Sequence, residues 1–222
     1  MAKRWTFHLS GGPVALDFAN TVSWRRSASP IERLPEYGHL VEWARQSGIL
    51  TAAAAEALVR SARRRPATAT RILARAWALR ESIYRLLAGL GAGRSPALAD
   101  LRLLDREFHE ALRHLHLTPT PAGVRLTWTR DAEPPLALPL WAAVRSAADV
   151  LVAANHRRLK TCPASNCGWL FLDTSRSATR RWCDMKVCGS RAKARAYYAR
   201  RRSSRRLPRT SRAPDLRCRP DA

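Results

Sequence analysis

Two pairs of cysteines near the C-terminus constrain this chain more than any other feature of its sequence. Four residues lie between Cys162 and Cys167, four lie between Cys183 and Cys188, and fifteen lie between the two pairs. The preceding 161 residues contain no cysteine. Four thiolates complete the tetrahedral coordination of a structural Zn²⁺ and leave no position open for a substrate. We therefore predict that these four cysteines hold one structural Zn²⁺.

The segment around the cysteines is too small to fold on a hydrophobic core alone. A unit spanning residues 159–202 needs a metal or another cross-link to compensate for its small core. Between the pairs we predict a strand at 168–173, a polar turn at 174–179 and a returning strand at 180–182. Residues 189–202 contain no proline and are rich in Ala and Arg, which predicts a helix. A hairpin and a helix around four ligands indicate a treble-clef-like zinc module.

The cysteine segment also resembles a known family. Residues 162–173, CPASNCGWLFLD, and residues 180–193, RRWCDMKVCGSRAK, closely resemble the CGNR zinc-finger family. The glycine pair at 11–12 and the LDFANT sequence at 16–21 resemble the ABATE domain that usually precedes this finger. Ser190 stands where the family name has Asn. The resemblance implies a zinc-dependent bacterial transcription regulator that binds DNA.

Upstream of the cysteines, apolar residues recur at helical spacing. They predict helices at 35–47, 51–65, 67–90, 95–115 and 140–158. Ser95 and Pro96 have the residue types of an N-cap and a first helical residue, and Leu98 and Leu112 belong to the apolar stripe of that helix. Residues 123–130 alternate between apolar and polar side chains, which predicts a half-buried strand, with residues 5–9 as its candidate partner.

These elements give a mainly α protein in three parts. Residues 1–158 form a helical domain with a small antiparallel β element, which we expect to sense a signal or to form a homodimer. Residues 159–202 form the zinc module. Residues 203–222 are rich in Arg, Ser and Pro and are expected to be a disordered basic tail.

Positive charge is concentrated at the C-terminal end. The chain has 40 Lys and Arg against 17 Asp and Glu, and residues 156–222 hold 19 of the basic residues but only 4 of the acidic ones. A bias toward Arg codons would act evenly along the chain, so this asymmetry indicates a polyanionic partner. We expect DNA. An RNA-binding or ribosome-associated protein, and a zinc-stabilised protein-interaction module, are the alternatives.

The predicted DNA contacts lie on the C-terminal helix and just before the second cysteine pair. Helical spacing places Arg191, Arg195 and Arg202 on one face with Tyr198, which could stack on a base. Lys193 and Arg200 point to the opposite side and are weaker candidates. The full set of predicted DNA-binding residues is Arg180, Arg181, Arg191, Lys193, Arg195, Arg200 and Arg202.

Three polar residues near the N-terminus interrupt an apolar run. Asp17, Asn20 and Thr21 either cap the first helix or line a small-molecule pocket, and we favour the structural role. The signal sensed by the protein is expected to be a small molecule or a redox change at the zinc thiolates.

Other classes of protein are disfavoured. No apolar run is long enough for a transmembrane helix, and the N-terminus lacks the apolar region of a signal peptide, so we expect a cytoplasmic protein. In that compartment zinc ligation is favoured over disulfides, and the cysteine spacings do not match common iron–sulfur patterns. His109, Glu110 and His114 resemble a zinc-protease helix motif, but the second His comes one residue too late to share a face with the first. We expect no enzymatic activity.

Overall fold

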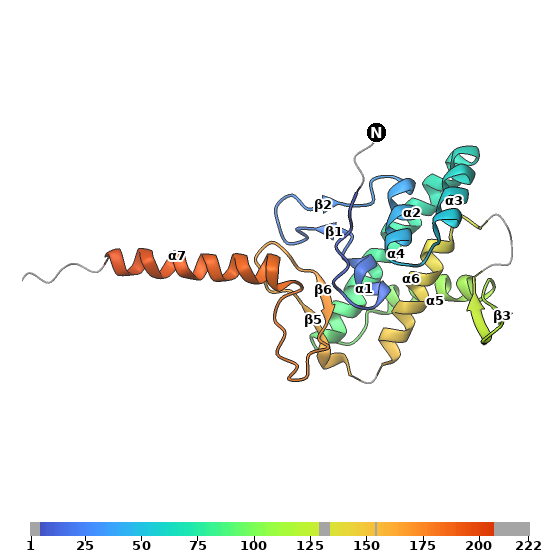
Figure 1. Ribbon diagram of the computed structural model, residues 1–222. Coiled ribbons are helices and arrows are strands. Elements are labelled where there is room, and N and C mark those ends of the chain that lie inside the picture. Colours follow the sequence, from blue (N-terminus) through green and yellow to red (C-terminus); the bar gives the residue numbers. More distant parts are fainter. Residues whose placement is uncertain (1–4, 129–133, 154, 207–222) are drawn as a thin grey trace, which may run out of the picture.

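The computed structural model describes residues 5–128, 134–153 and 155–206. They form a helical body to which the cysteine segment is attached, and the last helix extends away from both (Figure 1). The helices are α1 (Val14–Ala19), α2 (Tyr37–Gln46), α3 (Ala52–Arg64), α4 (Pro66–Gly91), α5 (Leu98–Leu112), α6 (Leu138–Val152) and α7 (Ser190–Arg206), with a 3₁₀ turn η1 (His156–Arg158) and a π-helical turn η2 (Met185–Gly189). The mainly α fold class is confirmed.

The helices of the body begin and end largely where local sequence signals predict. Thr51 caps α3, because its side-chain oxygen accepts the backbone N–H of Ala54 at 3.2 Å. Pro66 ends that helix and begins the long central helix α4. Gly91 closes α4 at a place where a side chain would not fit, since a Cβ there would lie 2.4 Å from the carbonyl oxygen of Leu159.

Helix α5 differs from its prediction in both start and orientation. It begins at Leu98 with Ala97 at the N-cap, so Ser95 and Pro96 lie outside the helix. Leu98 is 59 % exposed, whereas Asp100 and Glu107 are turned inward. Arginines of the neighbouring helix α4 explain this rotation: Arg85 pairs with Asp100, and Arg75 pairs with Glu107 at 2.7 Å.

Helix α6 ends six residues earlier than predicted. Its last residue is Val152, and Ala153 directly after it has an extended backbone conformation that ends the helix. The imidazole of His156 lies 3.2 Å from the carbonyl oxygen of Val150 and 3.0 Å from that of Leu151, so it satisfies acceptors that the helix end leaves free. The chain then turns toward the cysteines instead of continuing the helix.

The described strands form three separate two-stranded antiparallel sheets. They are β1 (Val22–Ser23) with β2 (Ile31–Glu32), β3 (His116–Thr120) with β4 (Gly123–Thr127), and β5 (Leu159–Thr161) with β6 (Leu170–Leu172).

The strand predicted at 123–130 pairs with β3 and not with residues 5–9. A two-residue connection brings β3 beside β4, whereas Gln46 holds the N-terminal segment by hydrogen bonds to the backbone of Trp5 and Phe7. The prediction of a half-buried strand is also wrong, because Val124 is 68 % and Leu126 is 50 % exposed. The end of the predicted strand, residues 129–130, lies outside the described residues.

One hydrophobic core joins the body to the start of the cysteine segment. Its buried side chains come from α1, α2 and the inner faces of α3 to α6, and they include Leu159 of β5 and Leu170 of β6. The cysteine segment is therefore built in part on the core of the body. In the part of the chain that the structure describes, no helix combines the length and apolarity needed to cross a membrane.

Candidate metal centre and basic helix

The first cysteine pair lies in the turn of the β5–β6 hairpin. Cys162 follows β5, and its N–H donates to the carbonyl of Trp169 at 2.7 Å. The N–H of Cys167 donates to the carbonyl of Ala164 at 2.9 Å, which closes a tight turn between the two thiols. Gly168 follows at φ 73°, a left-handed conformation that favours glycine. These bonds fix both sulfurs on one side of the turn.

The second pair is placed by Asp184. Its side chain accepts the N–H of Val187 at 3.1 Å and caps the π-helical turn η2. Its backbone carbonyl accepts the N–H of Cys188 at 2.9 Å, so the turn brings Cys188 back to Cys183. Helix α7 begins two residues later, at Ser190. The direction of α7 is therefore coupled to the cysteine cluster through a single turn.

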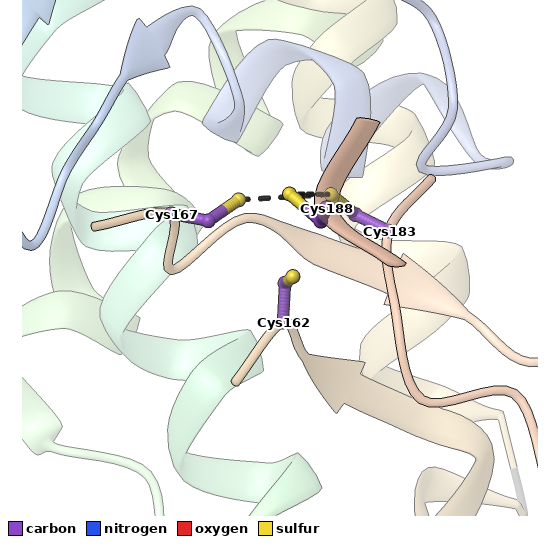
Figure 2. Close-up of side chains that lie close together, drawn as sticks. All are labelled: Cys162, Cys167, Cys183 and Cys188. Carbon is purple, nitrogen blue, oxygen red and sulfur yellow. Dashed lines mark hydrogen bonds between the residues drawn. The ribbon is translucent and has the colours of Figure 1, made fainter. Parts of the chain in front are cut away.

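All four sulfurs lie within 4.8 Å of one another (Figure 2). The Cys167 and Cys183 sulfurs are 3.6 Å apart, and the Cys183 and Cys188 sulfurs are 3.7 Å apart. Sulfurs at about 2.3 Å from a tetrahedral Zn²⁺ are separated by about 3.8 Å, so the spacing fits zinc. Three of the four cysteines are buried, and Cys167 is half-buried. The four cysteines form the site of one structural Zn²⁺.

The acid–base properties of the cluster explain why it needs a cation. Hydrogen bonds from the Cys167 and Cys183 thiols lower the pKa of Cys162. The same hydrogen bonds raise the pKa of Cys167 and Cys183, and burial raises the pKa of Cys188. Without metal, one thiolate therefore opposes the formation of the others. A divalent cation removes this repulsion and allows all four to ionise.

The hairpin of the module is formed by β5 and β6, so the returning strand predicted at 180–182 is not formed. Asp173, with no exposed surface, holds that segment instead. Its carboxylate accepts from Lys160 Nζ at 2.6 Å, from the N–H of Arg180 at 2.9 Å and from Ser175. These hydrogen bonds, that of Lys160 above all, hold the pKa of Asp173 well below its usual range. The pairing of Asp173 with Lys160 was not predicted from the sequence, although a lone Asp after an apolar strand was a usable signal.

Arg180 is half-buried against the module, and its guanidinium is engaged by backbone carbonyls. Its guanidinium donates to the carbonyls of Ser10, Trp182 and Cys183 and lies 4.5 Å from the centre of the Phe171 ring. These contacts join the N-terminal segment to the second cysteine pair. They use the donors that a phosphate would need, so we leave Arg180 out of the interface proposed below. Arg181 is exposed, with its guanidinium 5.5 Å from the Trp182 ring centre.

The remaining predicted DNA contacts lie on α7, which projects into solvent (Figure 1). From Ser190 to Arg202 every side chain is exposed except Ala192, which is half-buried. The basic residues on this exposed stretch are Arg191, Lys193, Arg195, Arg200, Arg201 and Arg202. Arg191 faces the body, where its guanidinium lies 5.4 Å from the ring centre of Trp24. The helix runs to Arg206, beyond the predicted start of the tail at 203; residues 207–222 lie outside the described residues.

Of the three polar residues near the N-terminus, Asn20 connects the body to the module, whereas Asp17 and Thr21 form hydrogen bonds within the body. Asp17 accepts the N–H of Gly11 at 2.7 Å, and burial raises the pKa of its carboxyl to about 6. Asn20 exchanges two hydrogen bonds of 2.8 Å with the backbone of Leu170, and Thr21 donates to the carbonyl of Phe18. The cavity beside them has a volume of about 10 Å³, which is room for one water. These contacts support the structural role.

Comparison with protein families assigns both parts of the chain. Residues 12–154 match the ABATE family, described as "putative stress-induced transcription regulator". Residues 158–201 match the CGNR zinc finger. Neither family is one of enzymes. No curated protein matches the chain.

Proposed function

Because this chain belongs to the ABATE family and carries a CGNR zinc finger, we propose that it is a transcription regulator that binds duplex DNA through helix α7. The observation that carries the proposal is the composition and exposure of that helix. Its 17 residues, SRAKARAYYARRRSSRR, include eight basic and no acidic side chains. A helix without an apolar face to bury gains little stability from the rest of the protein, and like charges along it repel. A polyanion would remove that repulsion.

The dimensions of α7 suit the major groove of DNA. The groove is about 12 Å wide and admits one helix, and arginines reach both phosphates and the guanine edge. The zinc site is expected to act as the fixed base of this helix, because Cys188 lies two residues before its start. Arg195 and Arg202 are the proposed base-reading or phosphate contacts, and Arg191 shares their face of the helix. Lys193 and Arg200, on the opposite side, are weaker proposed contacts. Arg181, at the edge of the module, is a further proposed phosphate contact.

The proposal extends to the rest of the chain. Residues 1–158 would form the sensing domain, residues 159–202 the DNA-binding module and residues 203–222 a basic extension that adds phosphate contacts. A cytoplasmic location follows from action on bacterial DNA. That the protein responds to a small molecule or to oxidation, and that it forms a homodimer, stay predictions.

The test is a comparison of charge-matched variants of the zinc-loaded protein. We expect Arg195→Ala with Arg202→Ala to weaken binding to a selected duplex by roughly 1–3 kcal/mol per residue if the arginines reach bases. If they contact only phosphates, binding should fall evenly across sequences, and the salt dependence should decrease by about one counterion per contact. The control carries Arg102→Ala and Arg106→Ala, two exposed arginines of α5. Fluorescence anisotropy at several salt concentrations measures both effects.

Three results would contradict the proposal. If the α7 variant binds duplex DNA as tightly as the α5 control, the helix does not form the interface. If structured RNA displaces duplex DNA at equal concentration but duplex DNA does not displace the RNA, the RNA-binding alternative is favoured. A zinc-loaded protein that binds neither polyanion would indicate the protein-interaction alternative.

A further inference from the structure

A cavity of about 360 Å³ lies between the helical body, the cysteine cluster and the start of α7. Its walls come from three separate parts of the chain. Trp24 follows β1 in the body, Asn166 and Trp169 belong to the first cysteine turn, and Arg191 and Arg195 project from α7. The volume falls in the range of small-molecule sites, which begins at about 300 Å³.

The zinc ion does not account for this space. Three of its ligands line one end of the cavity, and a metal bound at about 2.3 Å from each sulfur stays within the cluster. Trp24 and Arg195, which are not zinc ligands, also line the cavity. The space therefore extends beyond the metal cluster and can hold a second occupant.

Trp24 is held at the cavity in an unfavourable backbone conformation. Its φ is 55°, in the left-handed region that bulky side chains avoid. Its side chain is also 42 % exposed, so burial in the body does not compensate for this strain. Strained residues of this kind concentrate at binding sites. The strain keeps a large aromatic surface on the cavity wall and open to solvent.

The polar groups of the cavity suit an anion. The guanidinium of Arg191 lies over one face of the Trp24 ring, 5.4 Å from its centre, which leaves the other face for a stacked base, and Arg195 stands one turn further along α7. The carboxylate on the wall, Asp184, is already engaged by His8 at 2.8 Å. Residues 158–202 hold twelve basic and two acidic residues, so the module stays strongly positive even with a dianionic zinc–thiolate centre. The side-chain amide of Asn166 adds one donor group and one acceptor to this set.

We propose that this cavity binds a nucleotide, with the base stacked on Trp24 and the phosphate held by Arg191 and Arg195. Stacking of a base on an aromatic side chain tolerates any base, and Arg presents the paired donors that a phosphate accepts. The nucleotide is either free or extruded from DNA that lies on α7. Only the second source rests on the proposed function. In both cases the occupant would contact the body and α7 at once.

The experiment titrates deoxynucleoside 5′-monophosphates into the zinc-loaded full chain by calorimetry. We expect one saturable site, and about tenfold weaker binding after Trp24→Gly, which removes the indole and also relieves the strained φ. Trp24→Phe should retain most of the affinity because it keeps a ring. Arg191→Ala with Arg195→Ala should lose binding, whereas Lys193→Ala with Arg202→Ala changes the same charge on the same helix outside the cavity and should keep it. Metal analysis confirms that each variant holds one zinc.

The outcomes separate the two proposals and the two sources. No saturable binding by the parent, or equal loss in the Lys193 and Arg202 control, overturns the cavity proposal even if the chain binds duplex DNA. If the protein binds monophosphates but not duplex DNA, the cavity proposal is supported and only the proposed function is overturned. A duplex containing 2-aminopurine identifies the source. Its fluorescence rises on binding to the parent, and not to the Trp24→Gly variant, if the base is extruded; an unchanged signal assigns the site to free nucleotide.

Discussion

The helical body and the cysteine module achieve stability in different ways. The body buries a continuous apolar core that includes Phe18, Trp43 and the inner face of α4. The separate cluster of the module consists of three buried cysteines with Ala164 and Phe171, and partly buried Trp169 and Trp182 pack against it. So small a cluster cannot offset the entropy of ordering the chain, and bound metal must supply the difference. The cysteine module is too short to bury a sufficient core and needs a metal, whereas the longer body can rely on its core.

The two cysteine pairs differ in how they depend on the body. The first pair is connected to the body by Leu159 and Leu170, which belong to the shared core. Two hydrogen bonds add to this connection. The hydroxyl of Tyr84 donates to the carbonyl of Gly168 at 2.9 Å, and the indole of Trp169 donates to the carbonyl of Val22 at 2.8 Å. The second pair is linked to the body by the metal, by Arg180 and by the contact of Asp184 with His8 at 2.8 Å. Loss of zinc should therefore release the second pair and α7 while β5 and β6 stay in place.

The largest effect is expected from Cys183→Ser, which removes one zinc ligand. Structural zinc contributes roughly 10–16 kcal/mol to small metal-dependent units, so the variant should lose its metal, and residues 174–206 should lose protection. Hydrogen exchange of the body and of β5 and β6 should change little. Metal analysis and exchange mass spectrometry measure both. Cys218→Ser is the control and should keep one zinc; exchange that rises equally across the whole chain would show that the two regions are not separable.

A smaller effect is expected from Leu79→Ala in the core of the body. Leu79 is fully buried in α4, and truncation of such a leucine costs about 2–5 kcal/mol. The free energy of unfolding of the body, measured in urea, should fall by this amount while the native protein retains one zinc. Leu98→Ala on the exposed face of α5 is the matched control and should change stability little. Loss of zinc from folded Leu79→Ala would contradict the division of the two regions.

The connection between the regions is tested by Asn20→Ala. This change removes both hydrogen bonds to Leu170 and leaves a buried N–H and C=O without partners, at a cost of roughly 2–4 kcal/mol. We expect the unfolding free energy to fall and the rate of zinc transfer to a chelator to rise. Thr21→Ser, which retains the hydroxyl that donates to Phe18, serves as the neighbouring control. Destabilisation without faster zinc loss would show that β6 does not couple the body to the metal.

The smallest effect concerns pH. Burial raises the pKa of Asp17 to about 6 from 3.8, so the folded state holds its proton more tightly than the unfolded state does. Stability attributable to Asp17 is therefore highest at low pH, falls as pH rises from about 4 to about 6, and stays reduced above that. Asp17→Asn, whose amide oxygen can still accept the Gly11 N–H, should be more stable than the parent at pH 7 by up to about 3 kcal/mol.

The measurement for Asp17 is the difference in unfolding free energy between the variant and the parent at pH 4, 5, 6 and 7. Folding lowers the pKa of other carboxylates, such as Asp100 and Asp173, so their contribution to stability rises with pH. Taking the difference between variant and parent cancels this contribution. A difference that does not grow between pH 4 and pH 6 would contradict the assignment.

The sequence by itself determined the features that depend on neighbours in the chain. The cysteine spacing identified the zinc ligands, because a short loop that can place two sulfurs on one ion is a local property. Helices were located for the same reason. Thr51 and Pro66 lie at the two ends of the helix predicted at 51–65, the apolar period of residues 67–90 predicts α4, and each signal acts within one or two turns. The basic composition of α7 led to the proposed polyanionic partner without reference to the fold.

Only the tertiary structure decided which distant segments meet. The hydrogen bonds of Asn20 with Leu170 and of Arg180 with the carbonyl of Ser10 join residues 150 and 170 positions apart. The inward rotation of Asp100 likewise depends on Arg85 of a neighbouring helix. An alternating pattern predicts a strand but not the strand that pairs with it. The position of an Arg in the sequence likewise predicts a charge but not the groups that surround it. The cavity beside Trp24 is the clearest case. Its walls combine Trp24 with the cysteine turn and the start of α7, which lie about 140 residues or more further along the chain, so no local pattern could have predicted it.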